Sequence, residues 1–202
     1  MRNFTRGPEP EILQLHGERW NRQWVELRTG NPAAGFSWYT VDGMTARDHI
    51  LPALRAQTQR HCSFCDAFPV EGVSIESIEH FRPKSKSPEL AYSWINLYYC
   101  CDACQSAKRE KWDDRLLTPD APGYLCSAYF EFDYTTGEIK PNALCSDQDQ
   151  LRAATTIELY GLNLSSRRRN RQSEARKFAR QNSPVVDPDE WPYRDYLGLS
   201  PA

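Results

Sequence analysis

The chain has 202 residues, of which 40% are hydrophobic and 12% aromatic, enough apolar side chains for the core of one large or two small domains. No uninterrupted apolar run approaches the roughly 20 residues that span a bilayer, and the first residues, MRNFTRGPEPEI, lack the apolar stretch of a secretory signal. We therefore expect a cytoplasmic protein with no membrane partner. The net charge of −2 gives no overall sign of a nucleic-acid binder.

The first predicted element is a helix over residues 11–28. Apolar side chains recur at helical spacing from Leu13 to Leu27, with a proline before the stretch and a glycine after it. Trp20 and Trp24 lie on this apolar face. We therefore expect both tryptophans in the core and not on a stacking surface for ligands.

A second helix is predicted from Thr45 toward Arg60. Thr45 and Asp48 have the spacing of a capping box, in which each side chain caps a backbone N–H of the other residue. Pro52 either kinks this helix or marks its true start. Further along, residues 73–81 alternate imperfectly between apolar and polar, which makes them the best strand candidate in the middle of the chain.

The later part of the chain is predicted to contain a hairpin and two helices. Residues 129–132 and 138–139, separated by DYTTG, have the pattern of a small hairpin. Apolar residues recur on one face of a helix over 147–160, which Gly161 is placed to end. Ser165 is placed to cap the helix that follows.

Charge is unevenly distributed along the chain. Residues 165–181 hold seven Lys or Arg and one Glu, a local charge of +6, which leaves −8 for the rest (18 basic against 26 acidic residues). A helix of this kind contacts phosphate, meets an acidic partner or is simply solvated, and we expect binding of some kind. Residues 183–202 are predicted to form an extended tail that docks through Val185, Val186 and Trp191, or that stays undocked until a partner arrives.

Four of the seven cysteines form two C-x-x-C pairs, Cys62 with Cys65 in HCSFC and Cys101 with Cys104 in CDAC. A reducing compartment disfavours disulfides, and each pair forms a turn whose two thiolates can converge on one ion. Four soft ligands predict a closed tetrahedral site for structural zinc. A thioredoxin-like redox role would need one pair beside a βαβ pattern, which is absent, and two independent redox pairs are less economical than one metal site.

The other three cysteines are expected outside the zinc site. Cys100 directly precedes Cys101, so it is the residue most easily confused with a ligand. Cys126 and Cys145 belong to no pair. We expect both to be small buried residues.

The two pairs are separated by 35 residues, more than the roughly 15 to 20 of a common zinc ribbon. Polar side chains that can carry chemistry lie in this interval or just after it: Glu79, His80, Arg82, Lys84, Lys86, Asn96, Gln105 and Lys108. Burying such groups together is costly unless they have a task, so the cluster indicates a functional site. Taken singly, each residue is more often a surface charge, a core histidine or a turn former.

The order of these residues resembles that of the HNH (ββα-metal, or His-Me finger) endonucleases on a treble-clef zinc scaffold. It has C-x-x-C, an acid and His followed by PKS, then W-x-N-L, then C-x-x-C with a basic residue four positions on. Four stretches, IEHFRPKS, SWINLYYCCDAC, TGEIKP and TIELYGLN, resemble the PtuB-like nuclease subunits of Septu and retron antiphage systems. The resemblance extends from about Trp38 to about Arg171 and is specific in the middle.

This resemblance implies a role for each residue of the cluster. His80 falls on the general base, Glu79 on the metal-binding acid before it, and Asn96 on the residue that orients the imidazole. Gln105 falls where these proteins have their last metal-binding residue, commonly Asn or His. Either its longer amide reaches the ion or water replaces it, and an inactive descendant that keeps only the zinc fold stays open.

The chemistry of phosphodiester hydrolysis agrees with these roles. The reaction needs a base for water, a cation to offset the charge on phosphate, and basic groups that seat the nucleic-acid backbone. An imidazole can take the proton near neutral pH, and Glu79 supplies hard oxygen for Mg²⁺ or Mn²⁺. Arg82, Lys84 and Lys108 are the expected phosphate contacts.

The expected fold class is α+β, with a zinc-stapled ββα-metal (treble-clef HNH) core, flanking helices and a small C-terminal β-hairpin. The expected parts are an N-terminal helical region (1–60), the HNH nuclease core with the four-cysteine zinc site (61–115), a C-terminal hairpin with helices packed on the core (116–182) and an extended tail (183–202).

The expected function is a metal-dependent endonuclease that hydrolyses DNA, with RNA as the second choice. By the resemblance, it acts in antiphage defence beside a PtuA-type ATPase, and the retron relatives add a reverse transcriptase and its noncoding RNA as further partners. Two alternatives stay open. One is a non-catalytic zinc-stapled adaptor that binds nucleic acid or protein, and the other is a stand-alone restriction endonuclease.

Overall fold

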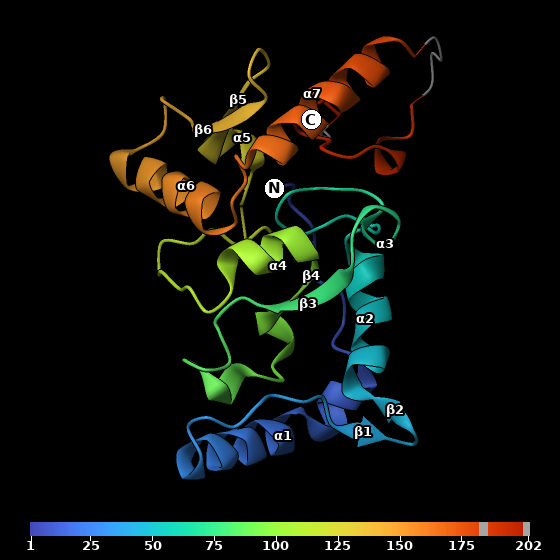
Figure 1. The fold of residues 1–202 in the computed structure, drawn as a ribbon, viewed down its shortest axis with the longest axis vertical. Helices are drawn as coiled ribbons and strands as arrows, with labels where there is room; N and C mark the ends of the chain where they lie inside the picture. The colour runs from blue at the N-terminus through green and yellow to red at the C-terminus, as the bar shows by residue number, and fades with distance from the viewer. Residues whose placement is uncertain (182–185, 200–202) are drawn as a thin grey trace.

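The computed structural model describes residues 1–181 and 186–199 and shows a mixed α+β fold (Figure 1). Its elements follow in the order α1 (Glu11–Gly30), β1 (Thr40–Val41), β2 (Met44–Thr45), α2 (Ala46–Gln57), α3 (Val70–Val73), β3 (Glu76–His80), β4 (Leu97–Cys101), α4 (Asp102–Lys108), α5 (Cys126–Tyr129), β5 (Phe130–Asp133), β6 (Glu138–Pro141), α6 (Asp147–Leu159) and α7 (Ser165–Ala179). Within the described residues the strands pair as three antiparallel two-stranded sheets, β1 with β2, β3 with β4 and β5 with β6.

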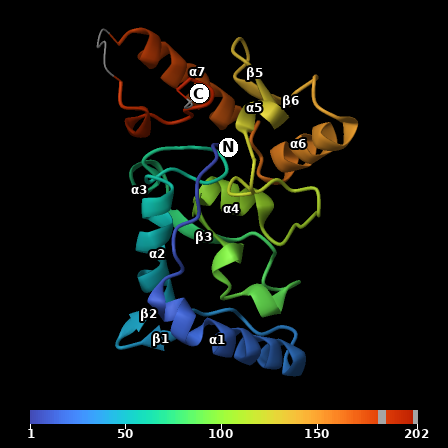
Figure 2. The same ribbon diagram turned by 180° about the vertical axis from the view of Figure 1, so that it is seen from behind.

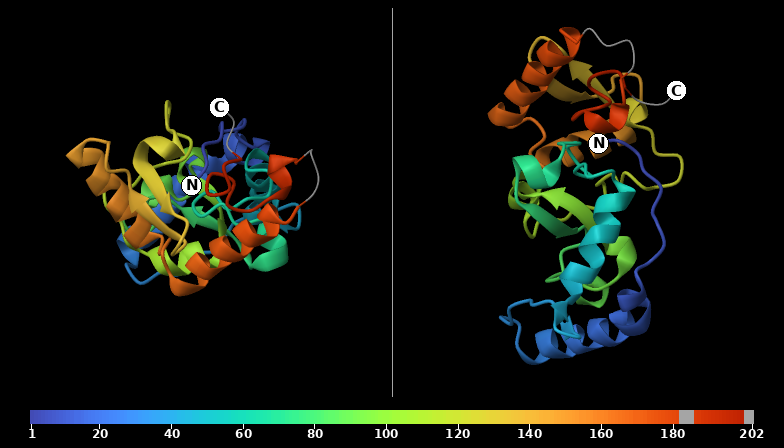
Figure 3. Two further views of the ribbon diagram at one scale, coloured as in Figure 1. Left: turned by 90° about the horizontal axis from the view of Figure 1, so that it is seen from above. Right: turned by 90° about the vertical axis from the view of Figure 1, so that its right-hand side faces the viewer.

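The elements are stacked along the long axis of the molecule (Figures 1 and 3). One end holds α1 with the β1–β2 hairpin, the middle holds β3, β4 and α4, and the other end holds the β5–β6 hairpin with α6 and α7. The first residues run alongside α2, so the N-terminus lies near the C-terminal elements (Figure 2). There the hydroxyl of Tyr124 donates a hydrogen bond to the carbonyl of Met1 at 2.7 Å.

Helix α1 buries the apolar face that its sequence predicts. Leu13, Trp20 and Trp24 are buried, and Trp20 stacks on Tyr39 with 5.5 Å between the ring centroids. Leu27 is 48% exposed, so the buried face ends earlier than predicted. No helix in the described part of the chain, α1 included, combines the length and the apolar character needed to cross a membrane.

Helix α2 begins with the predicted capping box. The backbone N–H of Asp48 donates to the Thr45 hydroxyl, and the Asp48 carboxylate accepts from the Thr45 backbone N–H at 3.1 Å. Pro52 lies inside the helix and does not mark its start. Ile50 and Leu54, both fully buried, bring α2 onto the central layer.

Strands β3 and β4 and helix α4 form the central layer. β3 pairs antiparallel with β4, with Glu76 opposite Cys101 and His80 opposite Leu97. β3 is shorter than predicted at its start, because Val73 ends the short helix α3. α4 follows β4 without a break, since Cys101 ends the strand and is also the N-cap of the helix.

The predicted C-terminal hairpin and helices are present with small shifts in their ends. Gly137, in the β5–β6 turn, has a φ of +73°, and a Cβ there would lie 2.5 Å from a backbone oxygen of α7. Helix α6 is capped by Ser146 and ends before Gly161, which has a φ of +58°. Ser165 is the first residue of α7 and not its cap, because the N-cap position belongs to Leu164, which makes no side-chain cap.

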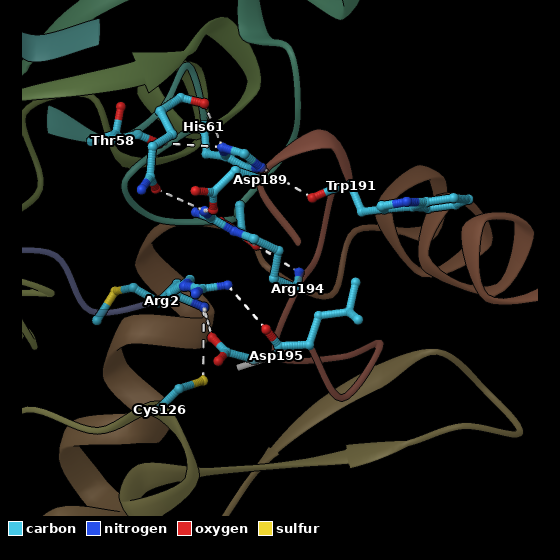
Figure 4. Close-up of polar contacts among 12 residues, drawn as sticks. Arg2, Thr58, His61, Cys126, Asp189, Trp191, Arg194 and Asp195 are labelled. Carbon is cyan, nitrogen blue, oxygen red and sulfur yellow. Dashed lines mark hydrogen bonds and ion pairs between the residues drawn. The ribbon is translucent and has the colours of Figure 1, made fainter. Parts of the chain in front are cut away.

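The described tail, residues 186–199, folds back onto His61, which directly precedes the first cysteine pair in the sequence (Figure 4). The Arg194 guanidinium forms an ion pair with Asp66, with Nη2 2.7 Å from Oδ1, and both side chains are 4% exposed. The carbonyl of Trp191 lies 3.0 Å from Nε2 of His61. The tail is therefore held by polar contacts with the turn of the first pair.

The three residues expected to dock the tail differ in their surroundings. Trp191 packs edge-on against Phe178 with 5.1 Å between ring centroids, and Val186 is half-buried. Val185 lies outside the described residues. The segment is therefore held both by the polar groups described above and by aromatic packing, since Tyr196 is 2% exposed and meets Phe132 edge-on at 5.6 Å.

Candidate functional site

The four cysteines of the two pairs meet at one point. The Sγ atoms of Cys62, Cys65, Cys101 and Cys104 lie within 4.8 Å of one another, and all four residues are buried. Four sulfurs bound tetrahedrally to zinc would be separated by roughly 3.8 Å, and Cys65 and Cys101 are already 3.6 Å apart. This cysteine cage, as we call the four residues, fits a structural zinc ion.

Backbone contacts bring the two pairs together. The turn of the first pair is closed by the N–H of Asp66, which donates to the carbonyl of Cys62 at 3.0 Å. The N–H of Ser63 donates to the carbonyl of Tyr99 on β4 at 2.9 Å, and the N–H of Cys101 points at Sγ of Cys62 at 3.4 Å. The first pair is therefore fastened to the strand that leads into the second.

The remaining cysteines lie outside the cage. Cys100 is fully buried, and its thiol donates to the carbonyl of Cys101. Cys126 is buried as expected, whereas Cys145 is only half-buried. None of the seven cysteines forms a disulfide in this structure.

A polar pocket of about 310 Å³ opens beside the central layer. Glu79, His80 and Gln105, three of the four predicted catalytic residues, line it. The other lining residues are Pro83, Lys84, Ser106, Arg109 and Glu110. Glu79 and His80 can face the same pocket, although they are neighbours on a strand, because β3 ends at His80.

His80 is held as a neutral imidazole. Its Nε2 lies 2.9 Å from the carbonyl of Ala91, which requires the proton on Nε2 and leaves Nδ1 without a hydrogen bond to the described protein. Trp38 stacks on the ring at 5.6 Å, and Phe36 meets it edge-on at 5.2 Å. Burial, together with the charge of Lys84, lowers the pKa of His80 to about 3. Its Nδ1 therefore carries a lone pair at neutral pH.

Asn96 does not contact the imidazole, contrary to the expectation. Its Nδ2 donates to the carbonyls of Arg82 and Leu90, both at 3.0 Å, and its Oδ1 accepts from the N–H of Arg82 at 2.7 Å. These bonds fix the segment between β3 and β4, which also carries Ala91. The Ala91 carbonyl orients His80, and Asn96 acts on the ring only through this segment.

Lys108 was expected to contact phosphate, but its side chain is buried and does not reach the surface. Its side chain is 0% exposed, and Nζ lies 2.6 Å from Oε1 of Glu79 and 3.0 Å from the carbonyl of His80. Burial raises the pKa of Glu79 to about 7, against the opposing charge of Lys108. Lys108 thus clamps the end of β3 to α4.

Two oxygen atoms in the pocket are available to a ligand. Oε2 of Glu79 has no hydrogen bond to the described protein, and Nε2 of Gln105 donates to the carbonyl of Ile78 at 3.2 Å, which leaves its Oε1 for a ligand. One carboxylate and one amide are few protein ligands. This number suits Mg²⁺, which keeps several of its waters when bound to proteins.

Three other basic residues lie near the pocket. Lys84 lines it, as the sequence suggests, whereas Arg82 is exposed over the ring of Trp112, at 4.9 Å, and is not part of the lining. Arg109 lines the pocket and was not predicted. It follows the last residue of α4 with a φ of +49°, and its Nε donates to the carbonyl of Ser106 at 3.1 Å. One indication of this role was present in the sequence, since Arg109 directly follows Lys108, which was itself an expected phosphate contact.

Comparison with known proteins gives a distant relationship. No family model matches the chain. The Septu protein PtuB of Bacillus thuringiensis is 24% identical to it over 119 residues, which cover 58% of this chain and 42% of PtuB. The chain therefore spans less than half the length of this relative. It is distantly similar to a Septu protein and has a four-cysteine cluster that can hold zinc.

Proposed function

We propose that the chain is a metal-dependent endonuclease of the HNH type that hydrolyses phosphodiester bonds, with DNA as its first substrate. The observation that carries the proposal is the pocket in which Glu79, His80 and Gln105 meet beside the cysteine cage. These are the positions at which the sequence resembles HNH enzymes. The distant similarity to Septu PtuB supports a role in antiphage defence.

His80 is the proton acceptor in this proposal. The Ala91 carbonyl holds the proton on Nε2, so Nδ1 is the nitrogen that takes a proton from water. The low pKa keeps the ring neutral before substrate binds. A phosphodiester anion in the pocket stabilises the imidazolium and raises that pKa when the base is needed.

The other residues of the pocket hold charge. Glu79 and Gln105 would hold a divalent cation, Mg²⁺ or Mn²⁺, which would supply positive charge beside the phosphate and the leaving oxygen. Lys108 holds the Glu79 carboxylate in place through an ion pair, with Nζ 2.6 Å from Oε1. Lys84 and Arg109 seat the phosphate backbone from the pocket wall.

We extend the proposal to a partner, an ATPase of the PtuA type, on the similarity to Septu PtuB. Phosphate contacts position a protein on nucleic acid but read no sequence. A nuclease whose site offers such contacts takes its choice of target from a partner. A retron reverse transcriptase and its noncoding RNA stay predictions from the sequence resemblance.

The test uses purified protein with plasmid DNA and with tRNA, in Mg²⁺ or Mn²⁺, with and without the ATPase. His80→Ala is expected to lower the cleavage rate about 10² to 10⁴-fold at unchanged zinc content, because it removes the base. His16→Ala, on α1 away from the pocket, is the matched control and is expected to cut like the wild type.

Each other outcome selects an alternative. Equal cutting by the wild type and His80→Ala at equal zinc content removes His80 from the mechanism. No cutting by any variant, even with the ATPase, favours the non-catalytic adaptor. Full cutting without the ATPase favours a stand-alone restriction endonuclease.

A further inference from the structure

Helix α7 presents two buried arginines to the region of the cysteine cage. Arg167 and Arg171 are 5% and 1% exposed, and residues four apart share one face of a helix. Nη1 of Arg167 lies 3.1 Å from Sγ of Cys104 and 3.1 Å from the carbonyl of Tyr160. A guanidinium from a helix 63 residues further along the chain therefore touches a cage sulfur.

Arg171 lies behind Arg167 on the same face. Its Nε donates to the carbonyl of Gly137 at 2.6 Å, and its Nη2 donates to Oδ1 of Asn163 at 3.2 Å. It also lines a small cavity together with Cys65. Both arginines are thus fixed between the C-terminal elements and the cage.

Neither arginine forms an ion pair with a carboxylate in the part of the chain that the structure describes, unlike the buried Arg194, which pairs with Asp66. One guanidinium nitrogen of each, Nη2 of Arg167 and Nη1 of Arg171, is buried without a hydrogen-bond partner among these residues. A buried charge without a counter-charge costs several kcal/mol. Among these residues, the negatively charged group that Arg167 touches is a sulfur of the cage, at 3.1 Å.

The cysteine cage supplies that charge. Four thiolates around one Zn²⁺ carry a formal charge of −2 in a buried place, and two guanidinium groups carry +2. We propose that Arg167, with Arg171 behind it, is the counter-charge of the zinc-loaded cage, so that zinc binding and the docking of α7 stabilise each other. Zinc would then hold the C-terminal helix as well as the central layer.

The burial of two arginines also lowers the positive charge that residues 165–181 present to solvent. Of the seven Lys and Arg residues in this segment, five remain outside the buried set, so the charge that α7 offers to solvent is smaller than the sequence indicates. The buried pair serves the fold of this chain. The basic residues of α7 are therefore not a single surface for nucleic acid.

The test measures zinc affinity in the full chain by competition with a chromophoric chelator. Arg167→Met is expected to raise the zinc Kd about 10 to 100-fold, the usual effect of removing a group that supports metal ligands. Arg167→Lys, which keeps the charge but loses the planar fork, is expected to have a smaller effect. Arg169→Met removes the same charge from an exposed position of α7 and is expected to leave the Kd unchanged.

Equal zinc affinities of Arg167→Met and Arg169→Met would overturn the inference. If Arg167→Met does not fold, hydrogen exchange of the wild type decides. Removing zinc is expected to raise amide exchange in α7 more than in α1, and an equal change in both helices, or none in α7, overturns the coupling. Neither readout depends on cleavage, so the outcome is independent of the proposed nuclease activity.

Discussion

The cysteine cage and the polar pocket share the central layer, but they handle charge in opposite ways. The cage is closed, all of its ligands are buried sulfurs, and Arg167 touches it from the side. The pocket is open to solvent and is lined by groups of both signs. A closed cage suits an ion that stays in place, whereas an open polar pocket suits an ion and an anionic substrate that come and go.

Burial moves the two central groups of the pocket toward their neutral forms. It raises the pKa of Glu79 to about 7 and lowers the pKa of His80 to about 3. Before any ligand binds, the pocket therefore holds less charge than its residue types suggest. A cation beside Glu79 and a phosphate beside His80 would each restore the charged form of its neighbour.

The largest expected effect comes from removing one sulfur of the cage. Cys101→Ser is expected to lose zinc and more than about 5 kcal/mol of the free energy of unfolding, because metal binding and folding are coupled at such sites. Zinc per chain by elemental analysis and denaturant unfolding measure the two losses. Cys100→Ala is the matched control, since Cys100 is buried next to Cys101 but outside the cage.

The control is expected to keep one zinc per chain and to lose only about 1 kcal/mol, a typical cost of a small buried truncation. The opposite pattern, with zinc lost in Cys100→Ala and kept in Cys101→Ser, would shift the cage by one residue. It would also break the contrast between a fixed cage and an adaptable pocket.

The second expected effect is in the pocket. Lys108→Met leaves the buried Glu79 carboxylate without its cation and is expected to cost about 3 to 5 kcal/mol in urea unfolding. Lys111→Met, at an exposed position, is the control and is expected to stay within about 0.5 kcal/mol of the wild type. Adding Glu79→Gln to Lys108→Met is expected to recover part of the loss. Unchanged stability of Lys108→Met would mean that the ion pair is not formed in solution.

These two regions also differ in what the sequence could predict. Each pair of the cage was predictable, because two cysteines three positions apart in a turn have few ways to point their thiolates, and the two pairs together supply the four soft ligands of one ion. The capping box at Thr45, the hairpin around Gly137 and the end of α6 at Gly161 were predictable for the same reason, since their signals lie within a few residues.

The pocket was only partly predictable, because its contacts join residues that are distant in sequence. The resemblance to HNH enzymes placed Glu79, His80 and Gln105 in one site, and all three line the pocket. It gave Asn96 the role of orienting the imidazole, whereas the carbonyl of Ala91 holds the ring. A backbone carbonyl leaves no trace in the residue type. The ion pair of Arg194 with Asp66, 128 residues apart, was equally invisible.

The third prediction concerns pH. A divalent cation competes with the proton for the Glu79 carboxylate, whose pKa of about 7 lies above its ordinary value. The affinity for Mn²⁺ is therefore expected to rise about tenfold from pH 6 to pH 8, with most of the gain near pH 7, and to level off above that. Electron paramagnetic resonance of free Mn²⁺ measures the affinity.

His80 stays neutral throughout this window, because its pKa of about 3 lies far below it. Glu79→Gln is expected to bind Mn²⁺ weakly and with no dependence on pH over the same range. A wild-type affinity that does not change between pH 6 and pH 8 would show that the ion does not bind at Glu79.

The smallest expected effect separates two neighbouring basic residues. Arg109→Gln is expected to leave stability unchanged, since the side chain is exposed, and to lower the affinity for a DNA oligonucleotide severalfold. It should also reduce the slope of log affinity against log salt by about 1, the signature of one lost phosphate contact. Fluorescence anisotropy in a His80→Ala background measures binding without cutting.

Arg109→Lys keeps the charge and is expected to keep the salt slope, while Lys111→Gln, outside the pocket lining, is expected to change neither quantity. An equal loss in Arg109→Gln and Lys111→Gln would mean that DNA senses only the general charge of this surface. A loss confined to Arg109 places the phosphate at the pocket wall. The adjacent Lys108 would then stabilise the fold and Arg109 would bind the substrate, two roles that sequence position alone cannot separate.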